Sequence, residues 1–146
     1  MNLNRYNLQA GEKLEVFEFI SEGPKGRIPK IVQYFPTNYK ELYHLGFGDK
    51  NQVTGEIDDT VVSNNSDSEK VLATVIATLY AFTDQHRGAL VYATGSTDAR
   101  TRLYRMGISK YLKEAQEDFE IYGELEDQWE LFKTDRDYKG FLIVRK

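Results

Sequence analysis

The sequence predicts an α+β fold with a mixed, largely antiparallel sheet and two main helices. Three observations lead to this prediction. Several segments before residue 64 alternate apolar and polar residues, as half-buried strands do. A helix-start signal at residues 66–69 opens a long apolar-faced segment. A second helical segment then lies between one strand and a final group of strands. Because strands and helices do not alternate regularly along the chain, the α+β class is favoured.

Composition and charge narrow the class of protein. The chain has 146 residues, 40% of them hydrophobic and 29% charged, which predicts one folded domain over residues 1–146. Cysteine is absent, so a disulfide framework or a thiolate metal site is excluded, and a reducing cytoplasmic location is expected. No apolar run marks a signal peptide or a membrane span, and we expect no membrane partner. The net charge of −4 argues against polyanion binding by the whole surface.

The first half of the chain is expected to supply three or four strands. Residues 13–21 alternate apolar and polar side chains, and a turn follows at residues 22–26. Pro29 and Pro36 lack backbone donors and therefore place the second strand at a sheet edge or at strand ends. In the third strand, Tyr43, Leu45 and Phe47 should share one face. The predicted strands are 13–21, 28–35, 41–48 and 55–63.

The first helix is predicted from Ser66 and Glu69, which have the spacing of a capping box, to about Gln85. Its broad apolar face should pack on the sheet. The opposite side carries small, uncharged residues, which predicts that another element, a partner or a second copy of the chain covers it. An exposed face of small residues is the plainer interpretation. That side consists of Ala73, Thr74, Ala77 and Ala81.

The second half is predicted to contain a strand at 90–94, a Gly-Ser-Thr turn, a basic helix and three final strands. The basic helix should run from the turn to Lys113, bent near Gly107. A projection at about 100° per residue makes Ala99, Leu103 and Met106 its core stripe. The final strands are expected at 118–125, 129–132 and 141–144.

The candidate site is the turn and helix between Gly95 and Arg105. A strand that turns tightly into a helix N-terminus offers free N–H groups and the positive end of a helix dipole to an anion. Arg100 in the first turn opposes that dipole and therefore needs a negative partner, either Asp98 or a bound phosphate or carboxylate. The predicted ligand-binding residues are Gly95, Ser96, Thr97, Arg100, Arg102, Tyr104 and Arg105.

Charge segregation gives a plainer alternative. The segment 95–113 carries five basic residues and the single acid Asp98, whereas all the charged residues of 114–130 are acidic. The two segments could neutralise each other across the surface. Alternatively, the bases contact a nucleic-acid backbone, with Arg102, Arg105, Lys110 and Lys113 as the contacting residues.

No motif assigns a reaction, a cofactor or a catalytic residue. The P-loop spacing and the G-x-G-x-x-G fingerprint are both absent, and Ser96 has no evident base. His44 and His86 are too few for a histidine metal site, and His86 at a helix C-terminus suits a structural role. Acids near residues 58–69 are better explained as caps and turns than as metal ligands, so no metal is expected.

Two resemblances extend this interpretation. The run GSTDARTRLYRMGI, with the later WELF and YKGFLIVRK, resembles a small uncharacterised bacterial family of about this length, which implies no particular activity. The element order, with Leu103-Tyr104 and Gly107-Ile108, is similar to the C-terminal half of GNAT-type acetyltransferases. That resemblance implies an acyltransferase with Tyr104 as the acid near the leaving thiolate. The sequence departs from that family at Asn64-Asn65-Ser66-Asp67-Ser68-Glu69, where a glycine-rich pyrophosphate loop would be expected.

Three classes of function therefore remain in view. The first is binding of an anionic small molecule or nucleic acid at the turn and helix 95–105, with a regulatory or toxin–antitoxin-like role by analogy. The second is a degenerate GNAT-like acyltransferase, which would require a splayed strand pair and a coenzyme A cleft. The third is a protein interaction module or homodimer that uses the Ala73, Ala77 and Ala81 side of the first helix.

Overall fold

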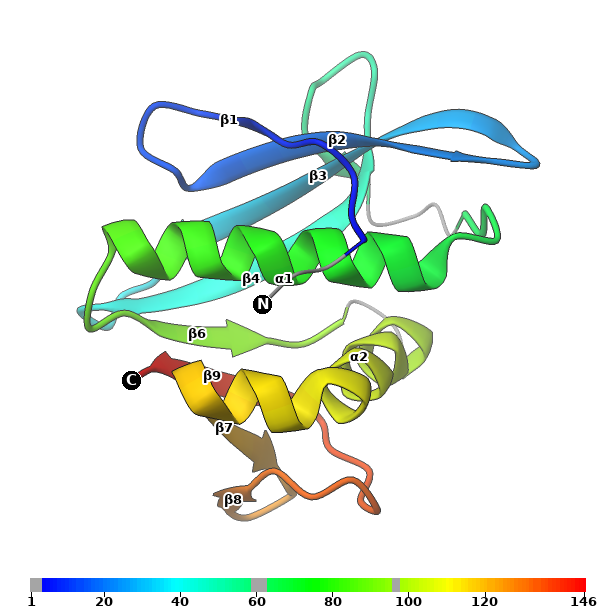
Figure 1. Ribbon diagram of the computed structural model, residues 1–146. Coiled ribbons are helices and arrows are strands. Elements are labelled where there is room, and N and C mark those ends of the chain that lie inside the picture. The colour runs from blue at the N-terminus through cyan, green and yellow to red at the C-terminus, as the bar shows by residue number, and fades with distance from the viewer. Residues whose placement is uncertain (1–3, 59–62, 96–97) are drawn as a thin grey trace. The chain divides into compact units, whose positions relative to one another are not determined.

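Strands and two helices form in the order that the sequence predicts. The computed structural model describes residues 4–58, 63–95 and 98–146. They form two units, which we call the N-terminal unit (4–34, 46–58 and 63–85) and the C-terminal unit (35–45, 86–95 and 98–146). The strand pairing is mixed and mainly antiparallel, so the α+β class is confirmed (Figure 1). The elements are β1 (Gln9–Ala10), β2 (Val16–Gly23), β3 (Gly26–Pro36), β4 (Leu42–Lys50), β5 (Ile57–Asp58), α1 (Ser68–Gln85), β6 (Leu90–Ala93), α2 (Asp98–Asp118), β7 (Phe119–Glu124), β8 (Trp129–Leu131) and β9 (Phe141–Arg145).

In the N-terminal unit the strand order is β1-β2-β3-β4, and β5 pairs with β4. β2 and β3 form an antiparallel hairpin that closes at Gly23 and Gly26. Gly26 has a φ of 89°, which a residue with a side chain rarely adopts. β3 lies between β2 and β4, so the prediction of an edge strand is wrong, although Pro36 does end β3. Pro29 pairs with Ile20 inside the hairpin, where the ladder continues on both sides of it.

The α1 helix packs its apolar face on this unit's strands. It begins at Ser68, and the Val71 N–H donates to the Asp67 carbonyl at 2.9 Å. Asp67 is therefore the N-cap, and the predicted cap at Ser66 is wrong by one residue because Ser66 has a left-handed φ of 59°. The predicted end at Gln85 is confirmed. Tyr34 anchors the helix, since its ring stacks on Phe82 at 4.1 Å between centroids.

The small-residue side of α1 is partly covered by the chain's own N-terminal segment. The Tyr6 N–H donates to Oγ1 of Thr74 at 2.9 Å, and this segment crosses α1 (Figure 1). Ala73 and Thr74 are buried, whereas Ala77 and Ala81 are only half-buried. The expectation that another element covers this side is thus met at Thr74, and an interface at the two remaining alanines stays a prediction.

A buried charge pair also lies in the N-terminal unit. The Lys30 ammonium, from β3, donates to Oδ1 of Asp49 in β4 and to Oγ of Ser63. The two charged side chains are only 7% and 13% exposed. Ser63 in turn donates to the same carboxylate, at 2.8 Å from Oδ2. The charges are therefore satisfied within the fold.

In the C-terminal unit the strand order is β4-β6-β9-β7-β8. The first half of β4 pairs with β6 in parallel, from Leu42 with Leu90 to Leu45 with Ala93, and the other pairs are antiparallel. The α2 helix lies along one face of these strands (Figure 1). That face is apolar and buried, through Val91, Ala93, Phe119, Ile121, Phe141 and Ile143. The three predicted final strands are confirmed as β7, β8 and β9.

The buried side of α2 differs from the predicted stripe. Tyr104 and Gly107 are its buried residues, whereas Ala99 is exposed and Met106 is 57% exposed. The stripe through Ala99, Leu103 and Met106 is therefore wrong. The projection ranked residues by apolarity, but the helix approaches the sheet through a tyrosine ring and a glycine. Of the helices in the described part of the chain, none combines the length and apolarity needed to cross a membrane.

Candidate functional site

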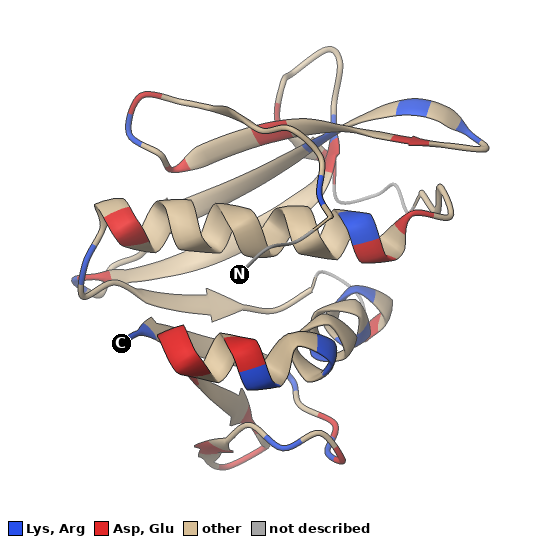
Figure 2. Ribbon diagram, viewed as in Figure 1, with Lys and Arg blue, Asp and Glu red and all other residues tan. Residues whose placement is uncertain are grey.

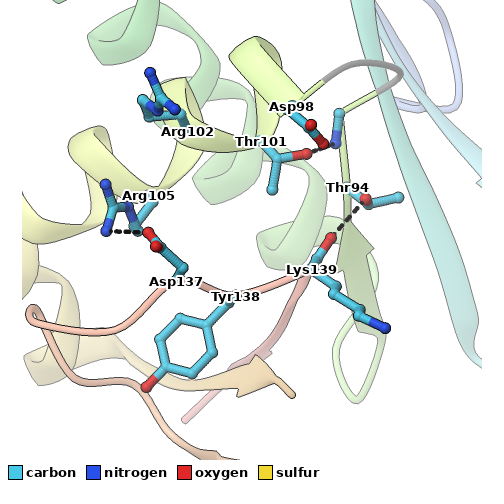
Figure 3. Close-up of a pocket in the computed structure, with 9 residues that line it drawn as sticks. Thr94, Asp98, Thr101, Arg102, Arg105, Asp137, Tyr138 and Lys139 are labelled. Carbon is cyan, nitrogen blue, oxygen red and sulfur yellow. Dashed lines mark hydrogen bonds and ion pairs between the residues drawn. The ribbon is translucent and has the colours of Figure 1, made fainter. Parts of the chain in front are cut away.

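A pocket of about 440 Å³ lies in the C-terminal unit beside the first turns of α2 (Figure 3). We call it the α2 pocket. It brings together the end of β6, one side of α2 and the segment that precedes β9. Of the predicted site residues, Gly95, Arg102 and Arg105 line it. The complete lining is Thr94, Gly95, Asp98, Thr101, Arg102, Arg105, Asp137, Tyr138 and Lys139.

Four residues of α2 form one wall of the pocket. Their spacing of three and four residues places Asp98, Thr101, Arg102 and Arg105 on one side of the helix. Arg105 is fixed by the segment opposite, because its Nη1 lies 2.7 Å from Oδ1 of Asp137 and donates to the Arg136 carbonyl at 3.3 Å. The charge of Arg105 is thus already engaged within the fold (Figure 3).

Gly95 has a structural role in this pocket. Its N–H donates to Oγ1 of Thr101 at 3.0 Å, so this amide is used internally and does not face a ligand. A Cβ at Gly95 would lie 2.5 Å from the Arg100 Cβ and from the Thr101 nitrogen, so glycine permits strand and helix to meet. The predicted contributions of Ser96 and Thr97 lie outside the described residues.

The structure separates Arg100 and Tyr104 from the pocket, since neither lines it. Tyr104 is only 6% exposed. Burial raises the pKa of its phenol, and the nearby positive charge of Arg100 opposes that rise. Both residues therefore lie outside the pocket, although the predicted ligand-binding set includes them.

Arg102 is an exposed cation of the pocket. Among the residues that the structure describes, it forms no ion pair or side-chain hydrogen bond, and neither does Asp98 four residues earlier. Figure 3 shows its guanidinium apart from the Arg105–Asp137 pair.

Two acids of the segment 114–130, Glu126 and Glu130, pair with basic residues that follow β8. Glu130 lies 3.2 Å from the Arg136 Nε and 3.9 Å from the Lys133 ammonium, and Glu126 lies 3.9 Å from the Lys139 ammonium. These bases belong to the loop that follows β8 (Figure 2). The sequence suggests that the basic helix neutralises the acidic segment. For these two acids, the loop after β8 provides the positive charges instead.

Sequence reasoning missed six of the nine lining residues. Asp98 and Thr101 could have been found from their helical spacing to Arg102 and Arg105. Thr94 ends the strand, and its hydroxyl donates to the Lys139 carbonyl at 2.9 Å. Asp137, Tyr138 and Lys139 come from a segment more than thirty positions away in the chain, and no local pattern indicates their approach.

Metal and acyltransferase chemistry find little support in the described residues. No three His, Asp or Glu side chains converge there as a cation site, and the rings of His44 and His86 pack beside Tyr92 and Tyr43. All of β6 pairs with β4, so β6 shows no splayed part. The Asp67 carboxylate, which accepts hydrogen bonds from Tyr6 and Ser21, stands at the start of α1. A pyrophosphate there would meet a negative charge.

We expect the free energy of unfolding to fall at alkaline pH because of the Tyr92 phenol. Burial and a 2.6 Å hydrogen bond to Glu124 raise its pKa from 10.0 to about 12. The folded state therefore favours the protonated phenol, and this contribution is complete below pH 10 and lost as the pH rises toward 12. In urea unfolding at increasing pH, the wild type should lose stability relative to Tyr92→Phe. Tyr39→Phe, which removes a phenol on a residue 74% exposed, is the matched control. Parallel curves for wild type and Tyr92→Phe would contradict the prediction.

Comparison with known proteins places the chain in one family. No curated protein and no solved structure shows significant similarity to it. A family model described as "Family of unknown function (DUF6934)" matches residues 2–146, and the expected membership of an uncharacterised family is thus confirmed. The chain therefore belongs to this family of unknown function.

Proposed function

We propose that the chain binds an anionic small molecule in the α2 pocket, with Arg102 as the principal contact. The observation that carries this proposal is the exposed Arg102 guanidinium, which has no partner among the described residues and stands in the first turns of a 21-residue helix. The helix N-terminus adds a positive potential at the same place. The volume of about 440 Å³ is in the range of small-molecule sites.

The lining residues indicate the kind of anion. A guanidinium offers two parallel N–H donors, which match a carboxylate or a phosphate. Besides Arg102 and the Asp137-paired Arg105, the lining includes the Lys139 ammonium, whose pair with Glu126 at 3.9 Å is exposed and therefore weak. Asp98 and Asp137 also line the pocket, so a ligand with one compact anionic group is favoured over a polyanion.

These features favour a small anion over the alternatives. A nucleic-acid backbone would meet Asp98 and Asp137, and Arg105 is already held by Asp137. Tyr104, the acid implied by the acyltransferase resemblance, does not line the pocket. A regulatory role and a homodimer on the Ala77 and Ala81 side remain predictions that the pocket does not address.

Arg102→Ala tests the proposal. Calorimetric titration of the wild type with inorganic phosphate and with acetate should show saturable binding, and the variant should weaken it by about 1.5–3 kcal/mol, the range for a charged hydrogen bond. Lys113→Ala is the matched control, because it removes the same charge from an exposed position on the same helix outside the pocket.

Two outcomes would overturn the proposal. One is the absence of saturable binding to the wild type, and the other is an equal loss in Arg102→Ala and Lys113→Ala. A parallel anisotropy assay with short DNA and RNA at about 50 mM salt covers the nucleic-acid alternative, since backbone contacts are strong there and weaken steeply as salt rises. If DNA or RNA binds tightly in that assay and the affinity falls steeply with salt, the ligand is nucleic acid and not a small anion.

A further inference from the structure

The face of the C-terminal unit's strands that points away from α2 is partly exposed and aromatic. We call it the outer face. The strand registers align His44, Tyr92, Leu142, Tyr122 and Leu131 in one row across β4, β6, β9, β7 and β8. Their neighbours along each strand, such as Val91 and Ile143, are the buried residues of the opposite face. Leu131 is 63% exposed, and the row is therefore open at the β8 end.

Tyr92, Trp129 and Glu124 form a corner on this face, which we call the Tyr92 corner. The rings of Tyr92 and Trp129 meet edge to face, with 6.0 Å between centroids and 74° between planes. The Tyr92 hydroxyl donates to Oε1 of Glu124 at 2.6 Å, and Glu124 pairs with Trp129 across β7 and β8. Gly140 leaves room for the phenol, because a Cβ there would lie 2.8 Å from the Tyr92 hydroxyl.

The outer face carries two carboxylates, Glu124 and Glu120, that form hydrogen bonds with tyrosine hydroxyls. Glu124 accepts from Tyr92, and Glu120 accepts from the Tyr122 hydroxyl at 2.6 Å. Neither carboxylate has an ion-pair partner anywhere in residues 4–58, 63–95 and 98–146. Trp129, beside Glu124, is 45% exposed. Exposed aromatic faces next to an unpaired carboxylate are complementary to a cation.

We propose that the Tyr92 corner binds an arginine or lysine side chain from a basic segment of a partner protein. A guanidinium or ammonium group would lie against the Tyr92 and Trp129 rings and pair with the Glu124 carboxylate, whose Oε2 accepts no described hydrogen bond. Exposed Leu131 offers apolar contact that a polypeptide would cover and a small ion would not. The two carboxylates disfavour nucleic acid. This site is separate from the α2 pocket, since none of the three corner residues lines that pocket.

Trp129 is the chain's only tryptophan, so intrinsic tryptophan fluorescence reports on this corner alone. The probe is a capped glycine–arginine peptide without free charged termini, and the matched probe replaces each arginine by citrulline, which keeps the shape and removes the charge. We expect the arginine peptide to cause a saturable change in tryptophan fluorescence and the citrulline peptide to cause none. Glu124→Gln should weaken binding by on the order of tenfold or more. Glu114→Gln, the same charge change at an exposed position of α2, should leave binding unchanged.

Other results would overturn the inference. An equal effect of Glu124→Gln and Glu114→Gln would mean attraction to net charge alone, and no saturable signal from the wild type with the arginine peptide would mean no site. Tetramethylammonium binding as tightly as the peptide would assign the corner to a small organic cation instead of a protein segment. Tyr92→Phe keeps the ring and removes the hydroxyl bond to Glu124, so it should retain most of the binding. Thermal unfolding of each variant confirms that the fold is intact.

Discussion

Lys30→Ala should lower the free energy of unfolding by about 3–5 kcal/mol, the range for removing one partner of a buried ion pair. The substitution leaves the Asp49 side chain, 13% exposed, with the Ser63 hydroxyl as a described partner and no ammonium beside it. A carboxylate in that position loses its attraction to the ammonium and regains little hydration. Urea unfolding of the wild type and the variant measures the difference.

A double variant separates the pair from the packing around it. Lys30→Met with Asp49→Leu removes both charges and should recover much of the lost stability, because no buried charge remains unpaired. Arg27→Ala provides the surface comparison: its pair with Glu22 spans 3.9 Å between side chains that are 70% and 63% exposed, so its loss should change stability by less than about 1 kcal/mol. If Lys30→Ala cost no more than Arg27→Ala, the pair would be effectively solvated, contrary to the prediction.

Lys30 also shows where sequence reasoning about the fold stops. The strands predicted at 13–21 and 28–35, with a turn at 22–26 between them, correspond to β2 and β3, because alternation and turn residues are local signals. A lysine within such a strand is ordinarily assigned to solvent, since lysine is rarely buried without a partner. Its partner Asp49 lies on another strand, and no pattern in the sequence pairs the two residues. Local periodicity therefore predicts the elements but not the buried polar contacts between them.

The candidate site likewise has parts that the sequence predicts and parts that it does not. The strand before Gly95 and the helix after it are local features, and the sequence identifies both. The side of α2 that packs is not local, because Tyr104 and Gly107 are selected by their fit to the sheet over the more apolar Met106. Of the three arginines, Arg102 and Arg105 line the pocket and Arg100 does not. The opposite wall, Asp137 to Lys139, depends on the path of a loop that has no periodic signal.

Gly123→Ala should destabilise the C-terminal unit by about 3 kcal/mol, the upper end of the usual range for overpacking. A Cβ at Gly123 would lie 2.5 Å from Cζ of Tyr138 and closer still to two other ring carbons. The ring cannot move freely, because it packs against Phe132 and Phe141 and its hydroxyl accepts the Lys133 N–H at 3.0 Å. Gly123 itself pairs with Glu130 and Phe141 within the sheet, so the backbone is also held. Urea unfolding gives the measurement.

The cause can be isolated by removing the ring. In a Tyr138→Leu background the same Gly123→Ala change should cost much less, so the double-mutant cycle should show a favourable coupling of about 1–3 kcal/mol. Gly11→Ala is the control for adding a methyl group, since its nearest neighbour would lie at an ordinary 3.6 Å. Additive costs in the cycle would mean that the two residues do not compete for space. Tyr138 also lines the α2 pocket, so Gly123→Ala should weaken phosphate binding there in proportion to the displacement of the ring, and unchanged binding in a destabilised variant would show that the pocket tolerates that displacement.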